Sequence, residues 1–157
     1  MKTGDFLSPI GVIRFVYSDE GLEELYFLHA TSIVEFDGIG DLFFDKVCEE
    51  LKAYFSGKLT VFSIPLVNKG TSFQRNVWSS LPGYGKTISY GELAKNLGDV
   101  NASRAVANAN AKNPCMILIP CHRVIGKDGA LTGYAGGVKR KKFLLELENG
   151  VRQGGLF

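Results

Sequence analysis

The chain has 157 residues, 45% hydrophobic and 22% charged, which fits one globular domain or two small ones with an apolar core. This balance excludes a disordered chain, a collagen-like repeat and a coiled coil, and no apolar run approaches the roughly 18 residues of a membrane helix. The net charge of +2 conceals a contrast between the halves. Residues 1–65 carry five Lys/Arg against eleven Asp/Glu, whereas residues 66–157 carry thirteen against five. The basic half indicates a polyanionic partner, nucleic acid before a membrane surface.

The acidic half predicts a small αβ domain. Two β-rich runs within Gly11–His29, joined by the turn residues Ser18–Gly21, predict a hairpin. Asp41–Phe55 predicts an amphipathic helix that Gly57 ends, and Val61–Val67 predicts a further short strand. We expect the apolar face of the helix to consist of Leu42, Val47, Leu51 and Phe55.

The charge changes sign at the segment 68–71, Asn-Lys-Gly-Thr, which we take as a linker between domains 1–68 and 69–157. Beyond it, Ser72–Leu81 predicts a helix, and Tyr90–Asn96 predicts a second that Ser89 caps and Gly98 ends. A third helix starts near Asn101 or Ser103, either of which can cap it, and stops before Pro114. Two short helices joined by a tight glycine turn are typical of a helix-turn-helix.

The last third of the chain alternates apolar and glycine-rich segments. Met116–Ile119 predicts a short buried run that leads into Pro-Cys-His-Arg-Val at 120–124. Glycine-rich loops follow, and Val138–Glu148 predicts a final helix. We expect that helix to be basic in its first turns and apolar at Phe143, Leu144 and Leu147.

Three cysteines, an odd number, speak against a secreted disulfide framework, and the first 15 residues contain Asp5 and Pro9, unlike a signal peptide. We therefore expect a cytoplasmic protein. Cys48 and Cys115 are most simply core residues. Cys121 lies beside His122 among glycine loops that leave room for a ligand, so it is a candidate nucleophile or, alternatively, a buried residue next to a structural histidine.

The spacing of these residues limits the chemistry. Adjacent side chains on a strand point to opposite faces, so Cys121 and His122 can act together only on a turn or short helix. A zinc site would need four ligands, usually in close pairs, and the chain has no pair of cysteines two to four residues apart. We expect no metal.

The segment 119–124, Ile-Pro-Cys-His-Arg-Val, resembles the signature of the O6-alkylguanine–DNA alkyltransferases, also called methylated-DNA–protein-cysteine methyltransferases. The resemblance covers roughly residues 70–150. Its further motifs are Phe-Gln at 73–74, Val-Trp at 77–78, ISYGELA at 88–94, SRAVA at 103–107, Asn-Pro at 113–114 and GYAGG at 133–137.

The resemblance implies an irreversible, single-turnover transfer of an alkyl group from O6-alkylguanine in DNA to Cys121, with O4-alkylthymine left open as a substrate. His122 would accept the thiol proton through a water, and Glu148 would orient His122. Asn113 would tie together the turn behind the recognition helix. On its own, Glu148 reads as a solvated residue at a helix end.

The same resemblance assigns the DNA and base contacts. The helix that begins at Ser103 would enter the minor groove of double-stranded DNA, Arg104 would fill the stack after guanine leaves, and Tyr90 would help to rotate the nucleotide out. The guanine pocket would be lined by Val124, Tyr134 and Ala135, where relatives often have Ser in place of Ala135. Further DNA contacts are expected at Gln74, Gly91, Ser103, Asp99 and Lys127. Asp99 fits this set least well, because phosphates would repel it. Other basic candidates for DNA contacts are Arg75 and the run Lys139–Lys142.

We therefore expect an α/β (α+β) protein. A small N-terminal αβ domain with an antiparallel sheet (1–68) precedes a helical, winged helix-turn-helix-like DNA-binding and catalytic domain (69–157). It would act as a monomer and without a cofactor, because the DNA itself donates the alkyl group. Two alternatives remain: a non-catalytic DNA-lesion binder on the same scaffold, and a cysteine hydrolase that uses Cys121 and His122.

Overall fold

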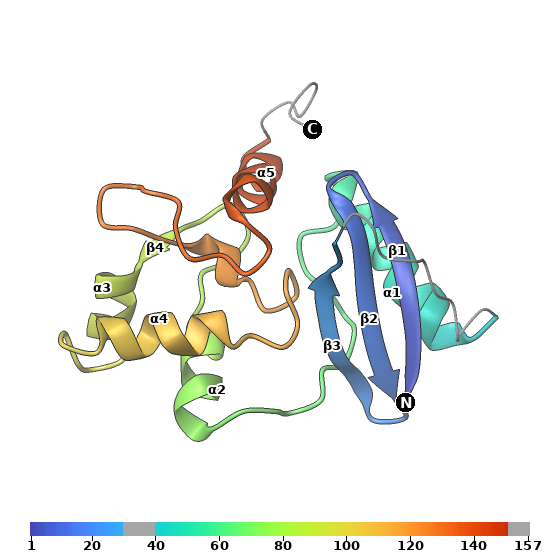
Figure 1. Cartoon of the computed structure of the whole chain (residues 1–157), viewed down its shortest axis with the longest axis horizontal. Helices are drawn as coiled ribbons and strands as arrows, with labels where there is room; N and C mark the ends of the chain where they lie inside the picture. Colours follow the sequence, from blue (N-terminus) through green and yellow to red (C-terminus); the bar gives the residue numbers. More distant parts are fainter. Residues whose placement is uncertain (30–39, 151–157) are drawn as a thin grey trace. The chain divides into compact units, whose positions relative to one another are not determined.

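The computed structural model describes residues 1–29 and 40–150 and divides the chain into two compact units, Met1–Asn68 and Lys69–Val151 (Figure 1). Each unit has its own core. The mixed architecture expected from the sequence is confirmed, with a three-stranded antiparallel sheet in the first unit and mainly helices in the second. Within the described ranges, no helix has the length and apolar character to cross a membrane.

The N-terminal unit is a meander of β1 (Lys2–Ser8), β2 (Gly11–Ser18) and β3 (Gly21–Phe27). The predicted hairpin is β2–β3, and its register shifts at Val16/Tyr17. Sequence analysis did not predict β1, whose Gly4, Asp5 and Ser8 are poor strand formers. Asp5 lies opposite Arg14 and accepts two hydrogen bonds of 2.9 Å from its guanidinium, so pairing with β2 compensates for the weak propensity.

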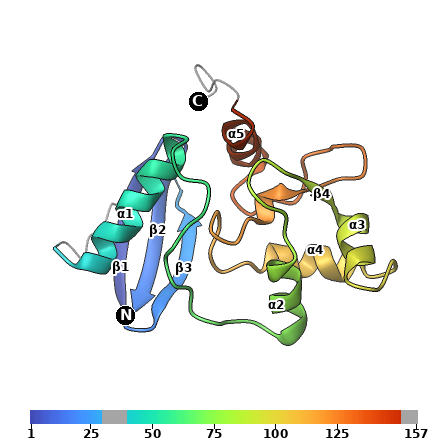
Figure 2. The same cartoon turned by 180° about the vertical axis from the view of Figure 1, so that it is seen from behind.

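Helix α1 (Leu42–Phe55) covers one face of this sheet (Figure 2). Gly57 follows its end with a φ of 74°, as predicted, whereas Asp41, predicted as its first residue, is instead the N-cap and accepts from the Phe43 N–H. The predicted apolar face is partly wrong, because Leu42 is 87% exposed and Phe55 is only half-buried. The buried residues are Phe44, Val47, Leu51 and Tyr54.

The strand predicted at Val61–Val67 is also wrong, since only Leu66 forms a bridge, to Leu22. The backbone N–H of Leu22 donates to the carbonyl of Pro65, and that of Val67 donates to the carbonyl of Leu22. Proline has no N–H to extend such a ladder. Gly21 permits this approach: it has a φ of 138°, and a Cβ there would lie 2.5 Å from the Pro65 oxygen.

The C-terminal unit contains four α-helices among its described residues, together with a short 3₁₀-helix and a parallel pair of two-residue strands. In chain order these are α2 (Ser72–Ser79), β4 (Ile88–Ser89), α3 (Tyr90–Asn96), α4 (Ser103–Ala111), η1 (Cys121–Arg123), β5 (Val124–Ile125) and α5 (Val138–Glu148). Sequence analysis predicted α3 and α5 with these bounds and placed the end of α2 two residues too late. The expected caps of α4 are wrong, because its N-cap is Ala102 and no side chain caps it.

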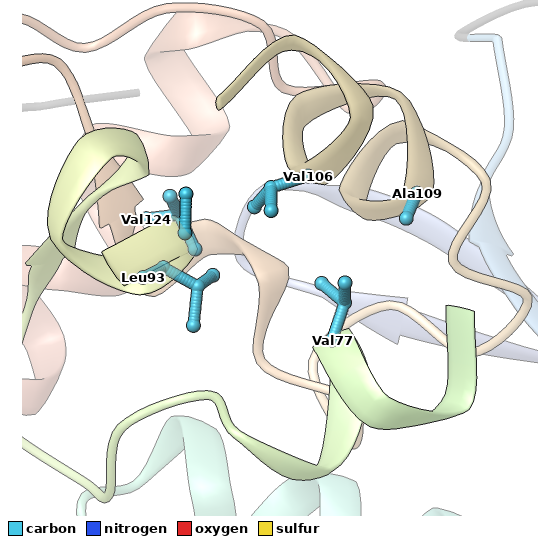
Figure 3. Close-up of a cluster of buried hydrophobic side chains, with 6 residues drawn as sticks. Val77, Leu93, Val106, Ala109 and Val124 are labelled. Atoms are coloured by element: carbon cyan, nitrogen blue, oxygen red, sulfur yellow. The ribbon is translucent and has the colours of Figure 1, made fainter. Parts of the chain in front are cut away.

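Helix α4 packs against both α2 and α3, and the cluster between them forms the core of this unit (Figure 3). The indole N–H of Trp78 donates to the Ala109 carbonyl at 3.0 Å and so fixes α2 to α4. This core supports β5 and the residues just before it. Its fully packed members are Val77, Leu93, Ala94, Val106, Ala109 and Val124.

The sheet face of the N-terminal unit leaves no room at Gly4. A Cβ added there would lie 2.4 Å from a ring atom of Phe44 and 2.6 Å from one of Phe15. We predict that Gly4→Ala lowers the free energy of unfolding by about 1–3 kcal/mol through overpacking. Gly83→Ala is the matched control, because a Cβ at Gly83 meets nothing within 4 Å; equal stability of the two variants in denaturant titrations would contradict the prediction.

Candidate active site

Cys121 is the first residue of η1 and is 5% exposed. A tight turn precedes it, in which the side-chain amide of Asn113 donates to the Ile119 carbonyl at 2.6 Å and its oxygen accepts from the Cys115 N–H at 2.9 Å. Ile117 adopts a φ of 73°, which is strained for a β-branched residue. The prediction that a turn or short helix carries Cys121 and His122 is confirmed.

His122 and Glu148 are joined in the interior. His122 is fully buried, and its Nε2 lies 2.6 Å from Oε2 of Glu148, the last residue of α5. Because a carboxylate accepts, Nε2 carries the hydrogen and Nδ1 is left as an acceptor. Nδ1 has no hydrogen-bond partner among the described protein atoms. Glu148, which sequence alone would leave in solvent, is 5% exposed.

Burial dominates the electrostatics of this pair. It raises the pKa of the Cys121 thiol, although a hydrogen bond with Asn113 and the charge of Lys141 act in the opposite direction. Burial also lowers the pKa of His122, against the effect of Glu148. At neutral pH the resting state is therefore a thiol beside a neutral imidazole, so the cysteine needs a base before it can react.

Two tyrosines stand near the cysteine. Burial raises the pKa of Tyr134 well above its usual value; its ring lies edge-on to that of His122, with centroids 6.4 Å apart. The hydroxyl of Tyr134 has no hydrogen-bond partner within the described part of the chain. The pKa of half-buried Tyr90, the first residue of α3, is raised by burial and also by the nearby Cys121. Ala135, next to Tyr134, is exposed.

Lys141 was expected among the basic candidates for DNA contacts in the run 139–142, and for this residue the expectation is wrong. Its side chain is fully buried, and its ammonium group donates to the carbonyls of Val124 and Thr132 and lies 6.0 Å from the centroid of the Tyr90 ring. Burial lowers the pKa of Lys141. A run of four basic residues gave no sign of this, although the helical period of α5 places Lys141 on the face of Leu144 and Glu148.

Helix α4 connects the exposed surface to the cysteine. Arg104 and Asn108 are exposed on it, whereas Asn110 is 4% exposed and donates its side-chain amide to the Cys121 carbonyl at 3.2 Å. Sequence analysis missed Asn110, which lies between Ala109 and Ala111 in a helix rich in small residues. Its only signal was a polar residue four positions after Val106, on the buried face of the helix.

The remaining residues expected to contact DNA are dispersed over the C-terminal unit. Gly91 and Ser103 lie close together near the starts of α3 and α4, where a Cβ on Gly91 would be 3.8 Å from the Ser103 hydroxyl. Gln74 forms a capping box with Thr71, so its side-chain oxygen already accepts a hydrogen bond. Lys127 is exposed in the turn at 126–129, and Asp99 accepts from the Asn101 N–H. Within the described ranges, no three His, Cys, Asp or Glu side chains gather as metal ligands would.

Comparison with known proteins assigns both units. The model described as the 6-O-methylguanine DNA methyltransferase DNA binding domain matches residues 72–150, and that of the family's ribonuclease-like domain matches residues 1–67. The chain is 46% identical over 148 residues to the methylated-DNA–protein-cysteine methyltransferase of Methanosarcina acetivorans, covering 91% of this chain and 95% of that protein.

Solved structures agree with the sequence matches. A Mycobacterium tuberculosis OGT crystallised in complex with DNA superimposes with a TM-score of 0.85 at 42% identity, over 96% of this chain and 94% of that one. The M. tuberculosis O6-methylguanine methyltransferase gives a TM-score of 0.81 at 40% identity, over 98% and 97%. The two units and the buried cysteine thus define a two-domain DNA methyltransferase architecture. The chain belongs to the 6-O-methylguanine DNA methyltransferase family, as the resemblance of its motifs implied.

The buried ammonium group of Lys141 yields a stability test. We predict that Lys141→Met lowers the free energy of unfolding by about 1–3 kcal/mol, because it removes the donor to two backbone carbonyls. Lys142→Met is the control: the neighbouring ammonium is exposed and only 3.9 Å from Glu146, so its loss changes stability by less than about 0.5 kcal/mol. Denaturant titrations that rank the two variants equally would refute this role of Lys141.

Proposed function

We propose that this protein repairs DNA by transferring an alkyl group from O6-alkylguanine to its own Cys121, once per molecule. The observation that carries the proposal is the buried arrangement of Cys121 on η1 beside the His122–Glu148 pair, in a chain of this family. A buried thiol with a raised pKa suits a single, protected reaction when a base lies next to it.

In the proposed reaction the thiol proton passes through a water to Nδ1 of His122, which is the acceptor because Nε2 donates to Glu148. Sγ of Cys121 attacks the alkyl carbon, a C–S bond forms and the C–O6 bond breaks. The electron pair of that bond stays on guanine, which takes up one proton while His122 gives up the one it received from the thiol. The products are S-alkylcysteine and guanine, and the charge of Glu148 stabilises His122 while the imidazole is protonated.

Recognition is assigned to the C-terminal unit. A base within a duplex is out of reach of a buried thiol, so the alkylated nucleotide must leave the stack. Helix α4 lies in the minor groove, Arg104 fills the gap, and Tyr90 acts on the extruded nucleotide. Val124, Tyr134 and Ala135 line the guanine pocket, and Asn113 holds the turn before Cys121 in shape. The remaining contacts to the DNA backbone come from Gln74, Gly91, Ser103 and Lys127.

In this proposal the chain consists of an N-terminal αβ domain, 1–68, and an alkyltransferase domain, 69–157. The protein acts as a monomer. The cytoplasm is its proposed compartment, since each of the three cysteines is a thiol in the structure.

The experiment that tests the proposal is an intact-mass measurement after mixing the protein with a duplex containing O6-methylguanine. We predict a gain of about 14 Da, located on Cys121, in at most one equivalent. Cys121→Ser should abolish this gain and still bind the duplex, because a hydroxyl is a much weaker nucleophile. Binding by the wild-type protein without any gain of mass would support the lesion binder, and repeated turnover of an acyl substrate would support the cysteine hydrolase.

His122 and Glu148 should act as a unit. We predict that His122→Gln and Glu148→Gln each slow methyl transfer by about 10²- to 10⁴-fold, and that the double variant loses little more than the slower single variant. Single-turnover rates on the duplex measure this, with circular dichroism to confirm that each variant is folded. Losses that multiply would show that the two residues act independently.

Arg104 should matter only where a base stack exists. We predict that Arg104→Ala slows transfer from the duplex by at least about 10-fold and leaves transfer from free O6-methylguanine nearly unchanged, since filling the stack offsets an extrusion cost of a few kcal/mol. The free base serves as the internal control. Equal losses on both substrates would make Arg104 a structural residue.

A further inference from the structure

Arg123 follows His122 within the signature segment, and the proposed mechanism gives it no role. It is the last residue of η1 and is 7% exposed. Its guanidinium donates to both carboxylate oxygens of Glu148, from Nε to Oε1 at 2.7 Å and from Nη2 to Oε2 at 3.1 Å. Nη1 donates to the Pro82 carbonyl at 2.9 Å.

Glu148 is therefore shared between His122 and Arg123. Its Oε2 accepts from Nε2 of His122 as well as from Arg123, and the side chains of His122 and Glu148 are fully buried. A buried carboxylate is stable as an ion when a cation compensates it. Because an arginine stays protonated in a protein, Arg123 supplies that cation permanently. The charges of Arg123 and Glu148 cancel, so the three side chains together are neutral only while His122 is neutral.

The other titratable groups near His122 reinforce this balance. Lys141 of α5 adds positive charge, whereas Cys121 and Tyr134 are uncharged when protonated, and burial raises the pKa of each. Tyr84, in the loop after α2, has its ring 5.8 Å from the Arg123 guanidinium carbon, and its pKa is also raised. Glu148 alone among these neighbours favours an imidazolium, and Arg123 is bound to both of its oxygens.

We propose that Arg123 is a positioning residue that keeps Glu148 ionised and, together with burial, keeps His122 neutral, so that His122 can accept the proton of Cys121 at neutral pH. This inference rests on the proposed function for its purpose, although not for its test. Without Arg123, Glu148 and His122 form a buried carboxylate–imidazolium pair, and the histidine is already protonated when the cysteine needs a base. The fork geometry matters, because a lysine has the charge but cannot donate to both oxygens and to Pro82 in the same way.

The test is an NMR titration of the histidine ring resonances, which are simple to assign because the chain has only His29 and His122. In the wild-type protein we expect His122 to remain neutral at pH 6.5, the ordinary midpoint of a histidine. In Arg123→Gln the midpoint of His122 rises by about one pH unit or more. The rate of methyl transfer to this variant falls at pH 7 and recovers at pH values above the new midpoint.

Two further variants separate positioning from folding. Arg123→Lys keeps the charge, so the midpoint of His122 stays near the wild-type value while the transfer rate falls about 10-fold. Arg14→Gln breaks a second arginine–carboxylate pair with two hydrogen bonds in the described part of the chain, that of half-buried Arg14 with buried Asp5 on β1. It lowers stability without moving the His122 midpoint.

A folded Arg123→Gln with the wild-type midpoint overturns the inference and leaves Arg123 a structural residue. If Arg123→Gln does not fold, the wild-type protein and Arg123→Lys decide. A His122 protonated at pH 7 in the wild type, or a transfer rate of Arg123→Lys equal to that of the wild type, overturns the inference. An unmoved His122 midpoint together with the lower transfer rate of Arg123→Lys supports it. The midpoint of the His122 titration can be measured whether or not the protein transfers alkyl groups. A wild-type protein that gains no methyl group therefore contradicts the proposed function and leaves this test standing.

Discussion

The carboxylate of Glu148 is the constraint on which the candidate active site depends. One buried charge at the end of α5 receives hydrogen bonds from two consecutive residues of η1, so the final helix fixes the position of the segment that carries the cysteine. Moving Glu148 by one helical position would rotate it about 100° away from η1.

The sequence predicted those parts whose information is local. Ser89 and Gly98 bound α3, Asp41 and Gly57 bound α1, and the period of apolar residues gave α5, because caps and amphipathic faces are encoded within a few residues. Strand β1 was missed because its stability comes from partners on β2, including the pairing of Asp5 with Arg14. The false strand at 61–67 has suitable side chains, but Pro65 and the approach of Gly21 allow only a single bridge.

The residues of the candidate site also fall into those that the sequence identified and those that only the fold reveals. The signature segment identified Cys121 and His122, and the resemblance of the motifs pointed to Glu148, which spacing alone would have left in solvent. Three further residues make their contacts only through the fold. Asn110 on α4 donates to the Cys121 carbonyl, and Arg123 donates to Glu148 on α5. Lys141 joins β5 to the loop before α5. Burial of a polar or charged residue is a tertiary property, and no local pattern in a basic or small-residue run reports it.

The left-handed backbone of Ile117 has a consequence for when the protein is reactive. That conformation costs an isoleucine about 1–2 kcal/mol, and burial of its side chain, 1% exposed, offsets this by about 1.5–3 kcal/mol. The turn before Cys121 therefore exists only when the surrounding core is complete. A nascent or partly unfolded chain carries the same cysteine without the neighbouring buried His122, the oriented turn or the surrounding core. If each molecule reacts only once, as proposed, the fold thus protects Cys121 from reaction until folding is complete.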